Sequence, residues 1–330
     1  MLIDRIWYTS RHPLSYLLRP LAWIFAGLGT LRRALFRVGF KQSIRLPVPV
    51  IVVGNITAGG TGKTPLTLYL ARQLQSLGYR PGIVSRGYGG KAQQPLCVSG
   101  GSDPLICGDE PILLARSGVP VYVFSDRAAA GQALLSACPD VDVLLCDDGL
   151  QHYRLQRDIE LCVVDGERGF GNGALIPAGP LREPVSRLKK LDAVIVNGRN
   201  DSISHPCLFQ MSLQPGVLYS PVYAPRHAWQ GLRVAAVCGI GNPARFFNTL
   251  KTLGLVFSEH AFADHHAFVA ADLPDADIIV VTEKDAVKLA VLADVRIWVL
   301  PVIAELTPDL AGWLGTEIAR LKHQMMNINE

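Results

Sequence analysis

Val48-Pro-Val-Ile-Val-Val53-Gly-Asn-Ile-Thr57-Ala-Gly-Gly-Thr-Gly-Lys-Thr64 is the stretch of sequence that decides the fold. Val48–Val53 is an apolar, largely β-branched run that ends at Gly54, as expected for a strand buried on both faces. The following segment, Pro65–Leu77, has leucines at helical spacing and ends before Gly78. A strand, a glycine-rich turn and a helix in this order form the context that a phosphate-binding P-loop requires.

The glycine-rich turn is predicted to bind the phosphates of ATP through Thr57, Ala58, Gly59, Gly60, Thr61, Gly62, Lys63 and Thr64. Glycine allows successive backbone N–H groups to approach phosphate oxygens without a Cβ clash. Lys63 is expected to place a positive charge on the β- and γ-phosphates and so to act in catalysis, while Thr64 offers its hydroxyl to Mg²⁺. Thr57 departs from the general motif, which begins with glycine.

Two carboxylates are predicted to complete the nucleotide site. The apolar run Val141–Cys146 reads as a strand, and Asp147 and Asp148 follow it at its carboxyl end, where sheets of this class bind ligands. We expect Asp147 to hold Mg²⁺ directly or through water, with Asp148 beside it as a further metal-site residue. The alternative, two acids that only end a strand, leaves their position beside a P-loop unexplained.

The rest of the chain alternates apolar runs with helical segments, which predicts an α/β fold. We expect a P-loop NTPase-type, doubly wound parallel sheet over residues 46–200, a short polar connector over 201–232, and a second, smaller α/β lobe over 233–330. In the first lobe, further strands are predicted at Gly82–Ser85, Val121–Phe124, Ile159–Val164 and Ala193–Val196, with helices at Pro111–Ser117 and Arg127–Ala137. The connector contains a strand-like piece, Phe209–Leu213, and the second lobe contains Val234–Gly239, Asn242–Leu253, Asp277–Val281, Arg296–Leu300 and a helix from Pro308.

Charge is concentrated at the N-terminus. The whole chain of 330 residues carries a net charge of +4, but residues 1–45 contain eight Lys and Arg side chains against Asp4 alone. The seven cysteines show no metal-ligand spacing and several lie in apolar runs, which is typical of buried thiols in a reducing compartment. The asymmetry indicates an N-terminal arm that faces an anionic partner.

The arm also contains an apolar run between Arg19 and Arg32, which includes Trp23 and Phe25. A run of about a dozen residues is too short to cross a hydrocarbon core that needs about 20. We therefore expect the arm to lie in the membrane interface with its arginines on lipid phosphates. The alternative is a helix packed on the body with solvated arginines. Nucleic acid is not an expected partner, because the arm is apolar and the body is acidic.

Taken together, the motifs resemble those of the tetraacyldisaccharide 4′-kinase family, the lipid A 4′-kinases of Gram-negative bacteria. The resemblance extends over most of the chain. It is carried by Val53–Pro65, Ser85-Arg-Gly-Tyr-Gly89, Gly108-Asp-Glu-Pro111, Asp147-Asp-Gly-Leu-Gln-His152, Pro180-Leu-Arg-Glu-Pro184, Gly239-Ile-Gly-Asn-Pro243, Phe262-Ala-Asp-His-His266 and Thr282-Glu-Lys-Asp285. Threonine at the first P-loop position is similar to the pattern of the family itself.

The resemblance implies transfer of the ATP γ-phosphate to the 4′-hydroxyl of tetraacyldisaccharide 1-phosphate, which forms lipid IVA at the cytoplasmic face of the inner membrane. The anionic glycolipid would be the partner of the arm. The resemblance also places the catalytic base at Asp109, aided by His265, with His266 left open as the true partner. Without the resemblance, Asp109 would be interpreted as a helix cap before Pro111.

The resemblance further marks residues expected on the substrate side. These are Arg86, Glu110, Gln151, Arg182 and Glu183, and the arginines suit phosphate or sugar oxygens. Each could instead form an ordinary surface ion pair.

An ATPase switch or metallochaperone with the same Gly-Gly-x-Gly-Lys-Thr turn is the main alternative. Such proteins carry a signature lysine where this chain has Ala58, which argues against them. A GTPase is disfavoured because Thr282-Glu-Lys-Asp285 is only superficially similar to a guanine-binding motif.

Overall fold

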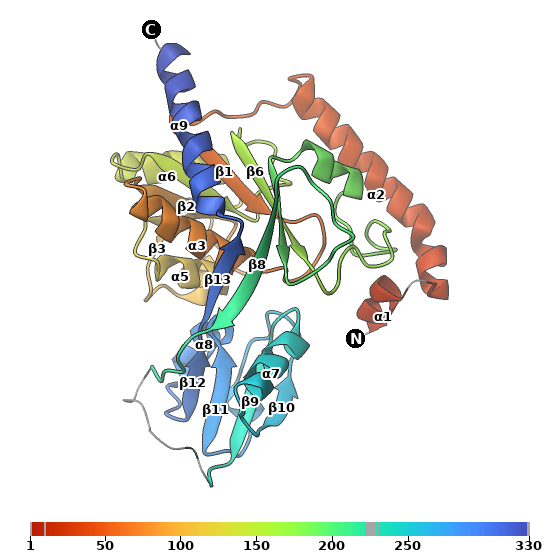
Figure 1. The fold of residues 1–330 in the computed structure, drawn as a ribbon, viewed down its shortest axis with the longest axis vertical. Helices are drawn as coiled ribbons and strands as arrows, with labels where there is room; N and C mark the ends of the chain where they lie inside the picture. Colours follow the sequence, from red (N-terminus) through yellow and green to blue (C-terminus); the bar gives the residue numbers. More distant parts are fainter. Residues whose placement is uncertain (1, 10, 222–228, 230, 329–330) are drawn as a thin grey trace.

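The computed structural model describes residues 2–9, 11–221, 229 and 231–328. Within these residues the chain forms two α/β lobes, one around a nine-stranded sheet and the other around a four-stranded sheet (Figure 1). Buried apolar side chains cover both faces of each sheet. The predicted α/β fold of the P-loop NTPase type is therefore confirmed.

The nine-stranded sheet has the order β13-β8-β7-β6-β1-β5-β2-β4-β3. Its strands are β1 (Val50–Gly54), β2 (Pro81–Ser85), β3 (Leu96–Val98), β4 (Val121–Val123), β5 (Val143–Asp147), β6 (Ile159–Asp165), β7 (Ala193–Asn197), β8 (Leu208–Pro215) and β13 (Val302–Thr307). Its helices are α3 (Lys63–Ser76), α4 (Pro104–Cys107), α5 (Asp109–Ala115), α6 (Arg127–Ala137) and α9 (Leu310–Ile328), with the 3₁₀ turn η1 at Val185–Lys190.

The central strand β1 pairs in parallel with β5 on one side and β6 on the other. In this register Val53 lies opposite Asp147, so the P-loop and the acidic end of β5 leave the sheet at the same edge. Parallel strands of a doubly wound sheet bind ligands at this edge. The pairing thus positions the nucleotide site.

The four-stranded sheet is entirely parallel and has the order β10-β9-β11-β12. It contains β9 (Val234–Cys238), β10 (Ser258–Ala261), β11 (Ile278–Thr282) and β12 (Ile297–Leu300). The helical segments of this lobe are α7 (Pro243–Thr252), α8 (Glu283–Leu289), η2 (Ala270–Asp272) and η3 (Ala290–Leu292).

Two of the expected domain boundaries do not match the observed assignment of strands to the two sheets. The segment 201–232, expected as a polar connector, contains β8, which pairs with β7 in the first sheet. The segment 233–330, expected to lie in the second lobe, returns to the first lobe at β13, which pairs antiparallel with β8. Helix α9 then packs on α3 and buries Leu314 and Ile318 in the core of the first lobe. The nine-stranded sheet is therefore mixed rather than purely parallel, because β3 and β13 are antiparallel to their neighbours.

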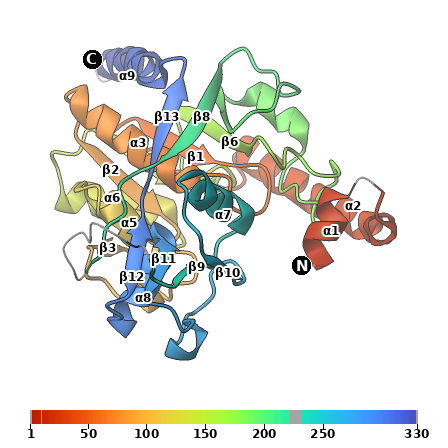
Figure 2. The same cartoon turned by 60° about the horizontal axis from the view of Figure 1, so that its bottom comes forward.

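The N-terminal arm forms α1 (Leu2–Tyr8) and α2 (Pro13–Arg37). In both views α2 lies on the flank of the first lobe that is opposite to α5 and α6 (Figures 1 and 2). The expectation that the apolar segment is too short to cross a membrane was wrong. The run between Arg19 and Arg32 belongs to a helix of 25 residues, which by length and composition alone could cross a bilayer.

Candidate functional site

The P-loop joins β1 to α3 with free backbone donors at the helix start. Helix α3 begins at Lys63, and the residue before it, Gly62, has φ +97° and no side chain to cap the helix. A Cβ on Gly62 would lie 2.5 Å from Nδ2 of Asn197, so glycine is needed both for the left-handed backbone and for space. The uncapped N–H groups and the helix dipole suit the phosphates of a nucleotide.

Neighbouring segments hold the loop in shape. Asn197, at the end of β7, donates from Nδ2 to the carbonyl of Thr61 over 3.0 Å. The N–H of Ala58 donates to the carbonyl of Pro180 over 2.7 Å, and the N–H of Arg182 donates to the carbonyl of Ile56 over 2.7 Å. The loop is therefore held from two sides before any nucleotide binds.

The two carboxylates at the end of β5 have opposite electrostatic surroundings. Asp147 is 1% exposed; burial and then the charge of Glu110 raise its pKa to about 7, although Lys63 opposes them. Burial also acts on Asp148, but Lys63 and Arg182 outweigh it and lower the pKa to about 2. Lys63 Nζ lies 3.5 Å from Asp148 Oδ1, and Arg182 Nη1 lies 3.2 Å from the same oxygen. Asp148 is thus a fixed anion, whereas Asp147 forms no ion pair with another described residue and Lys63 compensates its charge only in part.

Asp109 meets a histidine from the second lobe. His265 Nδ1 lies 3.3 Å from Asp109 Oδ2, which is an ion-pair distance. The two groups are not yet aligned as a hydrogen bond, because this oxygen has no hydrogen-bond partner among the described residues. Burial alone would raise the pKa of Asp109, but His265 and then Lys284 outweigh it and lower the pKa. Catalytic contacts of this kind are often loose until substrate binds.

Lys284, at the start of α8, fixes the tautomer of His265. Its Nζ lies 3.2 Å from Nε2 of His265, and an ammonium can only donate, so Nε2 accepts and the ring proton sits on Nδ1, towards Asp109. Lys284 also pairs with Glu110 over 3.0 Å and with Asp264 over 3.3 Å. Burial would lower the pKa of Lys284, but these carboxylates raise it, so the side chain stays charged.

His265 itself is held in an unusual conformation. Its φ is +61°, in the left-handed region, which costs a residue other than glycine about 1 kcal/mol. Its ring packs on Tyr88, with the ring centroids 4.8 Å apart. His266 turns away and pairs instead with Asp272, with Nε2 and Oδ2 3.0 Å apart. Of the two histidines, His265 is therefore the one that faces Asp109.

A cavity of about 470 Å³ lies between the lobes, and its lining includes Lys63, Glu110, Asp148, Arg182, His265 and Lys284. The first lobe contributes the P-loop, Asp148 and Arg182, and the second lobe contributes α7 and the start of α8. The part of the wall that comes from the second lobe is apolar near Ile240 and Phe246 and carries the cations Arg245 and Lys284. Arg245 Nη2 is 3.0 Å from Asp165 Oδ1 of β6, which is a further ion pair between the lobes.

Comparisons with known proteins agree with this geometry. A model of the family described as Tetraacyldisaccharide-1-P 4′-kinase matches residues 14–319. The chain belongs to the tetraacyldisaccharide 4′-kinase family. It is 52% identical to the tetraacyldisaccharide 4′-kinase of Chromobacterium violaceum, over 97% of this chain and 98% of that one. It is 49% identical to the enzyme of that name from Vibrio cholerae serotype O1 strain O395, over 93% and 94% of the two chains.

A solved structure gives the same result. The "apo" form of LpxK from Aquifex aeolicus in complex with ATP matches with a TM-score of 0.79 and 30% identity, over 93% of this chain and 99% of that one. The chain is therefore an ATP-dependent lipid A 4′-kinase, a phosphotransferase. The alternative of an ATPase switch or metallochaperone has no support among these relatives.

Within this kinase, the residues expected on the substrate side fall into different places. Arg182 and Glu110 line the cavity between the lobes. Arg86, directly after β2, is exposed and is not among the residues that line this cavity. Arg182 and Glu110 are thus near the P-loop, whereas a contact between Arg86 and substrate stays a prediction.

Glu183 and Gln151 are not among the residues that line the cavity between the lobes. Glu183 is only 2% exposed, and its carboxylate accepts hydrogen bonds from Gln151 Nε2 and the Tyr153 hydroxyl, both over 2.8 Å. Gln151 Nε2 also donates to the carbonyl of Asn55, directly after β1. Both side chains have partners within the protein, so they are placed to position the loops around the site.

Several residues of the site were not predicted. Asn197, Lys284, Asp264 and Arg245 act through contacts between segments that are far apart in the chain. The sequence did carry a signal for two of them, since Asp264 and Lys284 lie inside the motifs 262–266 and 282–285 that resemble the family. A lysine three residues after the end of a predicted strand has no recognisable role until its partner is known.

Proposed function

We propose that this kinase transfers the γ-phosphate of ATP to the 4′-hydroxyl of tetraacyldisaccharide 1-phosphate, with Asp109 as the base and His265 as its partner. The single observation that supports the roles is the approach of Asp109 and His265 from opposite lobes beside the cavity that the P-loop lines. A kinase needs its acceptor hydroxyl in line with the γ-phosphate, and a site between two lobes can close around both substrates.

The proposed chemistry begins at the acceptor hydroxyl. Asp109 Oδ2 takes the proton as the hydroxyl oxygen attacks the γ-phosphorus, while the bond to the β–γ bridging oxygen breaks and ADP leaves. A carboxylate with a lowered pKa is a weak base, so the proton transfer depends on how Asp109 is positioned against the hydroxyl. His265 holds Asp109 in position through Nδ1–H, and Lys284 keeps that tautomer. Lys63 and Arg182 face the charge that develops on the phosphates.

Mg²⁺ fits the acidic end of β5. Asp147 Oδ2 is buried and has no hydrogen-bond partner among the described residues, and its other oxygen accepts from Thr67 of α3 over 3.2 Å. Thr64 lies one turn earlier on the same face of α3. Mg²⁺ usually takes only one or two carboxylates together with phosphate oxygens and water, so Asp147, Asp148 and Thr64 suffice to hold it. When bound, the ion would neutralise charge on the β- and γ-phosphates.

We also propose that α2 attaches the enzyme to the cytoplasmic face of the inner membrane, where ATP is available. Its inner face is fixed to the body near both ends, by Ser15 Oγ on the carbonyl of Ala178 and by Arg33 on Glu183. Its outer face carries an exposed apolar stripe: Leu17, Leu21, Ile24, Leu28 and Leu31 are each more than half exposed. Because α2 is docked along the body, it could cross a bilayer only if the body of the protein entered the bilayer as well. The arrangement therefore favours a helix that lies in the interface.

The proposed function is tested by phosphate transfer from γ-labelled ATP to tetraacyldisaccharide 1-phosphate in mixed micelles. We expect label in the lipid, dependent on Mg²⁺, and none in the lipid with Lys63→Ala. Release of free phosphate at the same rate with and without lipid would contradict the proposal.

A further inference from the structure

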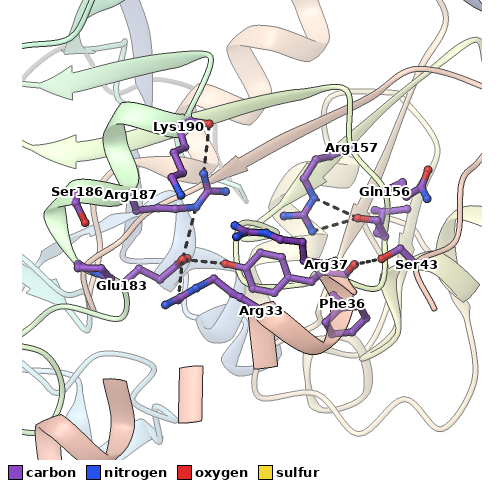
Figure 3. A pocket seen from close by; sticks show the side chains of 13 residues that line it. Arg33, Phe36, Arg37, Ser43, Gln156, Arg157, Glu183, Ser186, Arg187 and Lys190 are labelled. Atoms are coloured by element: carbon purple, nitrogen blue, oxygen red, sulfur yellow. Dashed lines mark hydrogen bonds and ion pairs between the residues drawn. The ribbon is translucent and has the colours of Figure 1, made fainter. Parts of the chain in front are cut away.

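A second pocket of about 530 Å³ lies beneath the C-terminal end of α2, outside the nucleotide cavity (Figure 3). Three segments form it: the last turns of α2, the loop before β6, and the turn η1. Its lining includes five basic side chains, Arg33, Arg37, Arg157, Arg187 and Lys190. The mechanism proposed above uses none of them.

The protein's own carboxylates do not neutralise this charge. Both carboxylate oxygens of Glu160 accept from Nη2 of Arg187 at 2.6 Å, and Oε1 also accepts from Nη1 of Arg157 over 3.1 Å. Glu183 lies between Arg33 and Arg187, at 3.4 Å and 3.6 Å, as the dashed lines in Figure 3 show. Five cations against two carboxylates leave an excess of three positive charges around one pocket.

Two of the five basic side chains form no ion pair with the rest of the described protein. Neither Arg37, on the last turn of α2, nor Lys190, at the end of η1, has an ion pair or side-chain hydrogen bond with another described residue. Both line the pocket and both are exposed. They are thus available to a ligand without breaking a contact that stabilises the fold.

The pocket floor, in contrast, is rigid. Arg157 donates to the carbonyls of Leu150, His152 and Leu155, so its guanidinium is fixed by the backbone. The Tyr153 hydroxyl is fixed by Glu183 over 2.8 Å. A fixed floor with free arginine and lysine side chains at its rim is well suited to a compact anion with several oxygens, which is the geometry of a phosphate.

The position of the pocket indicates where such a phosphate would come from. The pocket begins where the exposed apolar stripe of α2 ends, at the level at which lipid phosphates would lie if that helix rests in the interface. The pocket and the nucleotide cavity share one segment of the chain, because Arg182 lines the nucleotide cavity and the next residue, Glu183, lines this pocket.

We propose that this basic pocket binds the phosphate group of a membrane-borne lipid, through Arg37 and Lys190 in concert with Arg33. The proposal rests on the proposed function in that it needs the enzyme at a membrane surface. Two lipids supply this chemistry: the anionic phospholipid around the enzyme, and the acceptor, whose 1-phosphate is remote from its 4′-hydroxyl.

The test compares two double variants with the same loss of charge. Arg37→Ala/Lys190→Ala removes the two free cations of the pocket. Arg32→Ala/Lys189→Ala is the matched control, because these residues are the exposed neighbours in sequence and do not line the pocket. Thermal melting should show both variants folded as the wild type is.

One arm measures the KM for tetraacyldisaccharide 1-phosphate in neutral detergent micelles, beside the same acceptor without its 1-phosphate. The other arm measures sedimentation of the full chain with phosphatidylcholine vesicles that contain phosphatidylglycerol, and needs no activity. If the acceptor supplies the phosphate, the pocket variant raises the KM about 10-fold, for the phosphorylated acceptor only. If phospholipid supplies it, the same variant weakens vesicle binding about 10-fold at unchanged KM.

The control should change neither measurement by a comparable factor. Equal losses in the two double variants would show that general surface charge, and not the pocket, causes the effect. No loss in either arm would show that the pocket binds no lipid phosphate. Either result overturns the proposal. Failure of the wild type to phosphorylate any lipid would instead contradict the proposed function, and the vesicle arm would still report on the pocket.

Discussion

Asp147→Asn should stabilise the nucleotide-free enzyme while it abolishes phosphate transfer. The carboxyl is 1% exposed, and its pKa in the folded state is raised from 3.8 to about 7. A group with a raised folded pKa holds its proton longer in the native state, so the wild type loses stability as pH rises from about 4 to about 7. A shift of about three pKa units corresponds to about 4 kcal/mol above pH 7. Asparagine does not titrate, and it keeps the acceptor oxygen for Thr67.

The assay is denaturant unfolding of both proteins without nucleotide or Mg²⁺ at pH 5 and at pH 8. The advantage of Asp147→Asn in free energy of unfolding should grow by about 2 to 3 kcal/mol between these pH values. Asp148→Asn is the matched control. The pKa of Asp148 is lowered to about 2, so its charge contributes stability above the unfolded value, and the variant should lose about 2 kcal/mol at both pH values. Equal stability of wild type and Asp147→Asn at pH 8, or a difference that does not change with pH, would refute the reasoning.

Three further predictions concern the P-loop, the partner of His265 and the outer face of α2. Lys63→Ala should abolish transfer and leave the unfolding transition in place, because it removes the cation of the P-loop and not a core contact; steady-state turnover near that of wild type would contradict the P-loop assignment. Lys284→Met should lower kcat about 10- to 100-fold with little change in the KM for ATP, since His265 loses the donor that keeps its proton on Nδ1; an unchanged kcat would exclude the positioning role. Replacing Leu21, Ile24 and Leu28 with serine should move the enzyme from the membrane to the soluble fraction, because the outer face of α2 loses apolar area worth about 1.5 kcal/mol or more for each side chain that enters the interface; a variant that still sediments with membranes at moderate salt would show that α2 is not the anchor.

The sequence predicted those parts of the site that depend on local pattern. A β-branched run followed by a glycine-rich turn is enough to place Lys63 and Thr64 at the start of a helix. An apolar strand that ends in two acids is enough to place Asp147 at the same edge of a parallel sheet, because β1 and β5 are neighbours in register.

The features that the sequence did not predict depend on contacts between segments that are far apart in the chain. Nothing local shows that β13 returns to β8 across about ninety residues, since an alternating strand fits the edge of either sheet. The apolar run between Arg19 and Arg32 was considered without its flanks because arginines bound it, although these arginines continue the helix that contains the run. The choice between His265 and His266 needed coordinates, because it depends on a left-handed backbone at His265 that directs the two rings to different partners.

The central claim is that Asp109 and His265 act as one unit assembled from two lobes. A double-mutant cycle on the single-turnover transfer rate, with Asp109→Ala, His265→Ala and the double variant at saturating ATP, tests this most directly. The account predicts strong non-additivity, with the double variant barely slower than the slower single variant, because either change alone disables the pair. Losses in activation free energy that simply add would contradict it and would show that the two residues act independently.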